Sequence, residues 1–369
     1  MKYSNIGGQA VMEGVMMRNN DNYAVAVRTV HGEIAVKKST YHSLVSSQKV
    51  KKIPIVRGVF NFVDSLVLGM STLMYSAEFF AEETPAELEE RLSGEKKKAE
   101  KKAQRLRSQG KESEADKVIA AFEEKAAKER EENLKQAESK TPVEDKEDKK
   151  DDNSLLLGLT AAFSIVISVA LFMMLPYFLS TLLTRVTSSQ TLISIAEGCL
   201  RMAIFLGYLW LISRMKEIQR TFEYHGAEHK CINCIEHGLE LNVENVRISS
   251  RQHKRCGTSF LLIVMIISVI CFIFIRVPSP ALRIIIRLLL IPVIAGISYE
   301  FIRIAGRYDN KLVNLLSKPG LALQGMTTRE PDDSQIEVGI ASVEAVFDWK
   351  KYLNENFGAH YELDGEKEE

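Results

Sequence analysis

The chain has 369 residues, 46% of them hydrophobic and 26% charged, and its 48 basic and 48 acidic side chains leave a formal net charge of +0. This balance excludes a nucleic-acid-binding protein that relies on bulk positive charge. The averages combine several very apolar segments with one very charged segment, so they describe no single part of the chain.

Residues 1–57 form a glycine-rich segment followed by a predicted β-hairpin. The segment IGGQAVMEGVMMR at 6–18 lacks the strand and helix that a phosphate-binding loop requires, and Glu13 within it is either a site-lining residue or a solvated turn residue. Valine-rich runs at Tyr23–Val30 and Glu33–Lys38 predict two strands joined by a two-residue turn at His31-Gly32. No apolar run follows Lys2, so no cleavable signal peptide is expected.

Residues 58–81 and 82–153 differ sharply in character. The first segment is apolar but interrupted by polar residues, which favours an interfacial or partly inserted helix. The second is dominated by Glu, Lys, Ala, Gln and Asp, and predicts two charged helices paired as a coiled coil, with a disordered tether over Glu138–Asp152. It is either a solvated insertion or an arm that binds a protein partner.

Four long apolar runs predict transmembrane helices. Two lie within residues 154–213, at Leu155–Leu183 and Thr191–Ile212, and two within residues 260–304, at Phe260–Ile275 and Ile284–Ile302. Glu197 and Arg201 stand four apart in the second run and are expected to pair, and Glu300 near the end of the fourth is a candidate site-lining residue. The predicted fold is mainly α, a multi-pass membrane protein with about four transmembrane helices, an interfacial helix and a small N-terminal β-hairpin.

Charge in the loops predicts the orientation. The loop at 214–259 is rich in lysine and arginine, whereas the short turn between the first two predicted spans carries only Arg185. The positive-inside rule therefore places this loop, the charged insertion and the carboxyl-terminal segment 305–369 in the cytoplasm. Arg276, Arg283 and Arg287 on the outer side run against that rule. The lipid bilayer is the expected partner, and the oligomeric state is not indicated.

The loop at 214–259 contains two overlapping metal-binding patterns. In the first, His225-Gly226-Ala227-Glu228-His229, helical geometry places both imidazoles and the carboxylate on one face, because each residue advances about 100°. This arrangement is typical of zinc hydrolases in which the glutamate is the general base. In the second, Cys231-x-x-Cys234 precedes His253-x-x-Cys256 at the spacing of a structural zinc site. The alternative to both is a set of reduced thiols and hydrogen-bonded histidines.

The carboxyl-terminal segment begins with polar residues that precede a helix. The stretch LALQGMTTREP is loop-like, and its Gln324, Thr327, Thr328 and Arg329 either meet the site or fill turns. Ser334 and Glu337 stand at capping-box spacing and predict a helix start.

Four segments in this order, GGQAVMEGVMMR, YHGAEHK, HKRCGTSFLL and GMTTREPDDSQIEV, resemble the YqhQ-like family of bacterial multi-pass membrane proteins, often labelled as predicted metal-dependent enzymes. The resemblance covers nearly the whole chain apart from the charged insertion and implies a bacterial cytoplasmic-membrane location. It draws attention to His225, Glu228, His229, His253 and Cys256. Cys231 stands where a threonine is expected in relatives, which weakens the Cys-x-x-Cys pair as a ligand set.

Together these patterns predict one divalent ion, with zinc as the leading candidate. The expected ligands are His225, His229, His253 and Cys256, with Cys231 and Cys234 as additional candidates and Glu228 as the acid/base group. Two functions remain open: a metal-dependent hydrolase acting at the membrane surface, or a non-enzymatic scaffold or accessory protein with a structural metal. Three ligands and an open position beside Glu228 favour the enzyme, and four protein ligands favour the scaffold. A transporter would require an internal repeat, and the sequence shows none.

Overall fold

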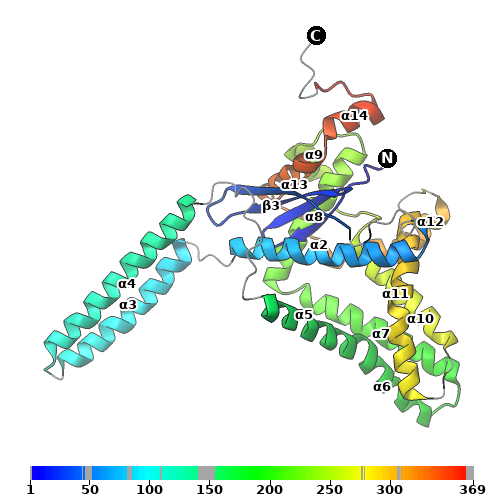
Figure 1. Ribbon diagram of the computed structural model, residues 1–369, viewed down its shortest axis with the longest axis horizontal. Coiled ribbons are helices and arrows are strands. Elements are labelled where there is room, and N and C mark those ends of the chain that lie inside the picture. Colours follow the sequence, from blue (N-terminus) through cyan, green and yellow to red (C-terminus); the bar gives the residue numbers. More distant parts are fainter. Residues whose placement is uncertain are drawn as a thin grey trace.

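The structure of the chain, a computed structural model, describes residues 2–43, 45, 52–80, 85–108, 110–139, 154–275, 277, 279–305, 308 and 310–362. Arg276 therefore lies outside the described residues, as do residues 140–152 of the predicted tether. The protein is mainly helical with one small antiparallel sheet near the N-terminus, as predicted (Figure 1).

The sheet is larger than the predicted hairpin. Its four strands pair in chain order, namely β1 (Gly7–Val11), β2 (Gly14–Asn19), β3 (Asn22–Arg28) and β4 (Ile34–Thr40). The hairpin of β3 and β4 is confirmed. The predicted two-residue turn is wrong, because the Thr29 N–H donates to the Glu33 carbonyl at 2.8 Å, which leaves three residues at the tip. Gly32 takes a φ of +87° there.

Helices cover both faces of the sheet. Val15, Met17 and Ala26 pack in one core with α8 (Lys216–Glu236), α13 (Asp333–Val346) and α14 (Trp349–Phe357). Their strand neighbours Met16 and Val25 point the other way, onto α2 (Val56–Phe80). This alternation follows from the two-residue period of a strand. The sheet therefore lies between α2 and the α8–α13 layer (Figure 1).

The helix α2 also connects the sheet to α11 (Pro280–Ala305). A Cβ atom on Gly58 would lie 2.8 Å from the Gly296 carbonyl oxygen, so the two backbones approach closely only because both residues are glycine. Arg57 donates to both carboxylate oxygens of Glu300, at 2.6 and 2.5 Å. In Figure 1, α2 lies across α11 rather than alongside it.

The charged insertion is a helical hairpin, α3 (Pro85–Arg107) and α4 (Glu112–Ser139), that projects away from the rest of the chain (Figure 1). Leu88, Leu92, Phe122 and Ala126 form its own small core. Ion pairs link the two helices, including Arg130 with Glu89 at 2.6 Å. The predicted pair of charged helices is thus confirmed.

Among the described residues, five helices are long and apolar enough to cross a membrane by length and composition, which suggests a membrane protein. They are Val56–Phe79, Ala162–Arg185, Gln190–Ile212, Gly257–Phe274 and Ala281–Ala305. The count exceeds the predicted four because α2 also qualifies. The first predicted span begins as α5 (Ser154–Val169) and continues through a π-helical turn (Ala170–Met174) into α6 (Leu175–Thr181). Pro176 lies just after that turn, and its missing N–H accounts for the interruption.

A buried cluster of charges joins the apolar helices. Glu197 on α7 (Gln190–Ile212) accepts a hydrogen bond from Arg201 at 2.9 Å, so the predicted pair is confirmed. Arg287 on α11 donates two more to Glu197, at 2.6 and 2.8 Å. Arg201 also donates to Ser268 on α10 (Gly257–Phe274) at 3.2 Å. The cluster therefore connects three helices, and its charged residues lie within their long apolar runs.

Candidate metal centre

The helix α8 carries the histidine pattern on a buried face. His225, Glu228 and His229 fall within about 100° of one another around the helix, as the sequence spacing predicts. Gly226 between them allows the segment after α12 (Lys311–Thr327) to pack directly on the helix, because a Cβ atom there would collide with the Arg329 carbonyl oxygen. The absence of that side chain therefore sets how closely the two segments pack.

Each of the two histidines is oriented by a backbone carbonyl. His225 Nδ1 lies 2.8 Å from the Thr327 carbonyl oxygen, and His229 Nδ1 lies 2.6 Å from that of Arg251. A carbonyl only accepts, so both Nδ1 atoms carry the hydrogen, and in the neutral ring Nε2 keeps its lone pair. This outer hydrogen bond is the arrangement that orients histidine ligands in metal sites.

The third group is Cys256, the N-cap residue of α10. Its Sγ lies 3.3 Å from His225 Nε2 and accepts the Thr258 N–H at 3.4 Å. Burial alone would raise the pKa of this thiol, but the neighbouring imidazoles of His225 and His229 outweigh burial and hold its pKa well below the usual range. Burial would likewise lower the pKa of His225, and Cys256 and Glu228 raise it instead, to about 9. The pair therefore favours a thiolate, the form that binds metals.

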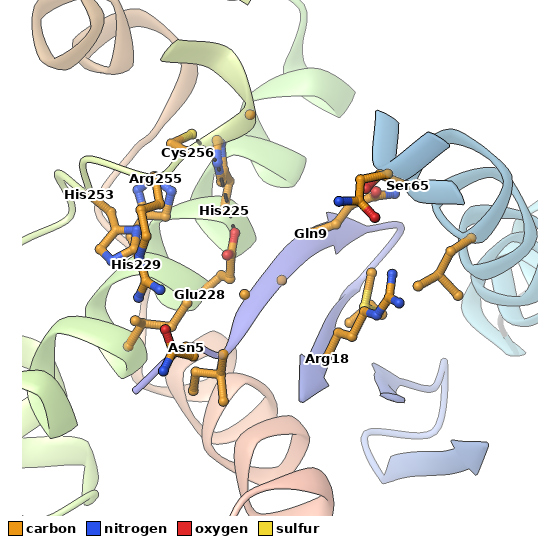
Figure 2. Close-up of a pocket in the computed structure, with 18 of the residues that line it drawn as sticks. Asn5, Gln9, Arg18, Ser65, His225, Glu228, His229, His253, Arg255 and Cys256 are labelled. Atoms are coloured by element: carbon orange, nitrogen blue, oxygen red, sulfur yellow. Dashed lines mark hydrogen bonds and ion pairs between the residues drawn. The ribbon is translucent and has the colours of Figure 1, made fainter. Parts of the chain in front are cut away.

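These three side chains can hold one metal ion. One ligand atom from each of His225, His229 and Cys256 lies within 4.8 Å of the others. Two imidazole nitrogens and a thiolate match the preference of zinc, and three protein ligands would leave a fourth tetrahedral position open. Figure 2 shows the imidazole of His225 directed at Cys256, with His229 beside them.

Glu228 lies next to this group on the wall of a pocket. Its side chain is 6% exposed, and Oε2 lies 3.9 Å from His225 Nε2. Gly8 of β1 packs against it, since a Cβ atom there would lie 2.9 Å from Glu228 Cγ. The carboxylate is thus held close to the ligand atoms without being one of them.

The pocket has a volume of about 480 Å³ and extends from the ligand group to α2 and α11. Its far part is polar, with Gln9 and Arg18 from the sheet, Asn61 and Ser65 from α2, and Tyr299 from α11. Figure 2 shows Gln9, Arg18 and Ser65 on the side opposite the histidines. A bound molecule could therefore reach both Glu228 and the surface of α2.

His253, a predicted ligand, lies just outside the group of three. Its ring is centred 5.7 Å from that of His229, and its Nε2 lies 3.6 Å from Glu236 Oε2. Gln324 fixes its backbone, accepting from the His253 N–H at 2.9 Å and donating to the His253 carbonyl at 2.7 Å. Burial lowers the pKa of His253, although Glu236 opposes this, and so favours the neutral ring.

The other candidate residues lie elsewhere. Cys231 and Cys234 point into the core between α8, the sheet and α13, where burial raises the pKa of Cys231 well above its usual value and that of Cys234 to about 11. Two residues advance about 200° around a helix, so Cys231 is directed away from His229. Glu13 binds Arg220 and accepts from the Tyr224 hydroxyl at 3.2 Å, and Glu300 binds Arg57; neither lines the pocket.

Some functional residues carried a partial signal in the sequence and others carried none. Gln324 and Thr327, for which a role at the site was one of two alternatives, do hold His253 and His225. The carbonyl of Arg251, the close approach of Gly8 and the side chain of Arg18 carry no local signal, because only the folded chain brings them to α8 and its pocket.

Comparison with known proteins identifies the family of this chain. A family model described as "Protein of unknown function (DUF1385)" matches residues 53–349. The chain is 33% identical over 339 residues to the uncharacterized protein YqhQ of Bacillus subtilis (strain 168). The aligned residues make up 91% of this chain and 90% of that protein. No solved structure matches the chain. The chain therefore belongs to the DUF1385 family of YqhQ-like proteins.

Proposed function

We propose that this protein is a membrane-embedded, metal-dependent hydrolase whose zinc-type ion is held by His225, His229 and Cys256. One observation carries the proposal: three donor atoms converge within 4.8 Å beside a pocket, and both imidazoles are oriented by carbonyls that bind Nδ1. Buried histidines that serve only packing have no need of this convergence.

The number of ligands favours an enzyme over a scaffold. Within the described residues, three protein ligands come together, whereas a closed structural site normally has four. A zinc ion held by these three residues would supply Lewis acidity for hydrolysis near neutral pH. Glu228, whose Oε2 lies 3.9 Å from His225 Nε2 at the pocket wall, would act as the acid/base group that accepts a proton beside the ligands.

The shape of the pocket supports a substrate presented at a membrane surface. Its wall includes Asn61 and Ser65 of α2, and α2 lies across α11 between the sheet and the apolar helices (Figure 1). An amphipathic helix in that position is suited to lie in the interface of a bilayer. A substrate with an apolar part in the bilayer could then place its polar part near Glu228.

The orientation that we propose puts the metal centre on the cytoplasmic side of the membrane of a bacterium. The segment between α7 and α10 carries many basic residues, and the turn before α7 carries only Arg185. A reducing compartment also suits the five cysteines, all of which are free thiols.

A second candidate uses the same residues without a metal. The 3.3 Å contact between Cys256 Sγ and His225 Nε2 is also the geometry of a cysteine nucleophile paired with its base. That reading gives His229 no role in the chemistry, although its Nδ1 is held in the same way. The two candidates differ in their response to chelators, which would inactivate only the metal enzyme.

The test of the proposed function compares Glu228→Gln with Glu217→Gln, an exposed position in the first turn of the same helix. Metal content would be measured on detergent-purified protein, and function by complementation of a deletion strain. Glu228→Gln should retain the metal and fail to complement, since removal of a general base costs about 100-fold or more in rate. Glu217→Gln should behave like the wild type. Full complementation by Glu228→Gln, with metal retained, would refute the hydrolase and leave the structural metal.

A further inference from the structure

A second pocket, of about 620 Å³, lies at the end of α7. The candidate span of α7 ends at Ile212, so this pocket lies at the level where the helix would leave the bilayer. We call it the arginine pocket after three of its residues, Arg214, Arg251 and Arg329; Trp210, Glu223 and Glu330 also line it.

Two of these guanidinium groups have no acidic partner in the described part of the chain. Arg214 lies 3.8 Å from the centre of the Trp210 ring, and Arg329 donates to the Ser213 carbonyl at 3.3 Å. Both side chains therefore lie at the end of α7, against Trp210 and Ser213. Within the described residues, neither guanidinium group forms an ion pair with a carboxylate.

The two carboxylates of the pocket are already engaged. Glu330 binds Lys230 at 2.8 Å and Arg251 at 3.6 Å, and Glu223 accepts from Gln335 at 2.9 Å. Three arginines therefore line the pocket with two carboxylates, and one of these carboxylates, Glu330, is also bound by Lys230 from outside the lining. An excess of positive charge in a pocket at the end of a span favours an anionic ligand.

We propose that the arginine pocket binds a phosphate group, supplied by the headgroup of an anionic phospholipid or by a free phosphate ion. Guanidinium groups match phosphate oxygens with two parallel hydrogen bonds, which an ammonium group cannot do. Trp210 is the residue type that lies at headgroup level, and Arg214 stacked on it extends from the span toward the phosphates.

The arginine pocket is also connected to the metal centre. Arg251 donates to the Thr328 carbonyl at 3.1 Å, and its own carbonyl accepts from His229. Arg329 packs on Gly226, next to His225. A phosphate that orders Arg251 and Arg329 therefore steadies the backbone that orients both histidines, and it should raise the affinity for zinc. This coupling rests on the proposed function, whereas the binding site itself does not.

The binding test uses the full chain in detergent with Trp349→Phe, so that Trp210 is the single remaining tryptophan of the two in the sequence. The probes are dihexanoylphosphatidylglycerol, dihexanoylphosphatidylcholine and inorganic phosphate, and the readout is the fluorescence of Trp210. The phosphatidylglycerol should give a saturable change at a Kd about tenfold or more below that of the phosphatidylcholine. If inorganic phosphate gives the same response as the phosphatidylglycerol, free phosphate is sufficient. If only the phosphatidylglycerol gives a response, the lipid headgroup is the ligand.

Variants connect this signal to the arginines. Arg214→Gln and Arg329→Gln should each weaken binding about tenfold, the usual effect of losing a hydrogen bond from a charged group. Arg214→Lys should lose less, because it keeps the charge. Arg185→Gln, in the turn before the other end of α7 and outside the pocket, should lose nothing. Equal binding of the two lipids, unchanged by both glutamine variants, would overturn the site. Binding without any change in zinc affinity would overturn only the coupling.

Discussion

The ligand set is tested most directly by treating the two neighbouring histidines separately. His229 belongs to the group of three whose ligand atoms lie within 4.8 Å of one another, whereas His253 lies next to Glu236. We therefore expect His229→Ala to lose the metal and His253→Ala to keep it. His237, exposed at the end of α8, provides the matched control.

The size of each effect follows from these positions. A zinc site contributes on the order of 10 kcal/mol, and a third of that, about 3 kcal/mol for one of three ligands, corresponds to a Kd about 100-fold higher. His253→Ala removes a ring that is 4% exposed and leaves a cavity beside Glu236, so it should cost about 2 kcal/mol or more of stability. It should weaken zinc binding by less than about tenfold, which is the smallest loss usual when a residue that orients a metal ligand is replaced.

The assay is competition with a chromophoric chelator on detergent-purified protein, combined with thermal unfolding of the metal-free form. His229→Ala should shift the zinc titration and His253→Ala the unfolding temperature, while His237→Ala changes neither. If His253→Ala loses zinc as completely as His229→Ala, His253 is a ligand and the site has four protein ligands. That outcome would favour the scaffold.

Three further predictions follow from charge. The proton on His225, whose pKa is raised to about 9, competes with the metal, so zinc affinity should increase from pH 7 to pH 9 by up to about one decade per pH unit; a flat profile in chelator competition would contradict this. Glu197→Gln leaves two guanidinium groups facing each other in a buried cluster and should destabilise the protein in detergent by about 3 kcal/mol or more; a loss below about 1 kcal/mol would show that water reaches the cluster. In intact cells, an impermeant maleimide should label Arg185→Cys but not Lys351→Cys, and the reverse pattern would invert the proposed orientation.

Much of the architecture could be predicted from the sequence because it depends on local periodicity. The apolar runs, the two charged helices and the contact between Glu197 and Arg201 all follow from residues a few positions apart on a helix. The shared face of His225 and His229 is of the same kind. Each of these features depends on neighbouring residues and not on the packing of a distant segment.

Two other elements, the start of α13 and the first two strands, differ from what the sequence predicted. The capping box lies at Asp332 and Gln335, two residues earlier than predicted, since Asp332 caps the helix and its carboxylate binds the Ser334 hydroxyl. The strands β1 and β2 lie in a glycine-rich segment with little strand propensity, and their pairing and burial between α2 and α8 stabilise them.

The choice of ligands was decided only by the tertiary structure. By spacing, Cys231 and Cys234 are as good candidates as Cys256, and His253 as good as His229. Packing of α8 against the sheet and α13 buries the first two thiols in an apolar core. Meanwhile the N-terminus of α10 brings Cys256 to His225 across thirty-one residues, with the Thr327 carbonyl from a third segment completing the geometry. A contact between segments so far apart depends on how whole helices pack, and no pattern within one segment encodes it.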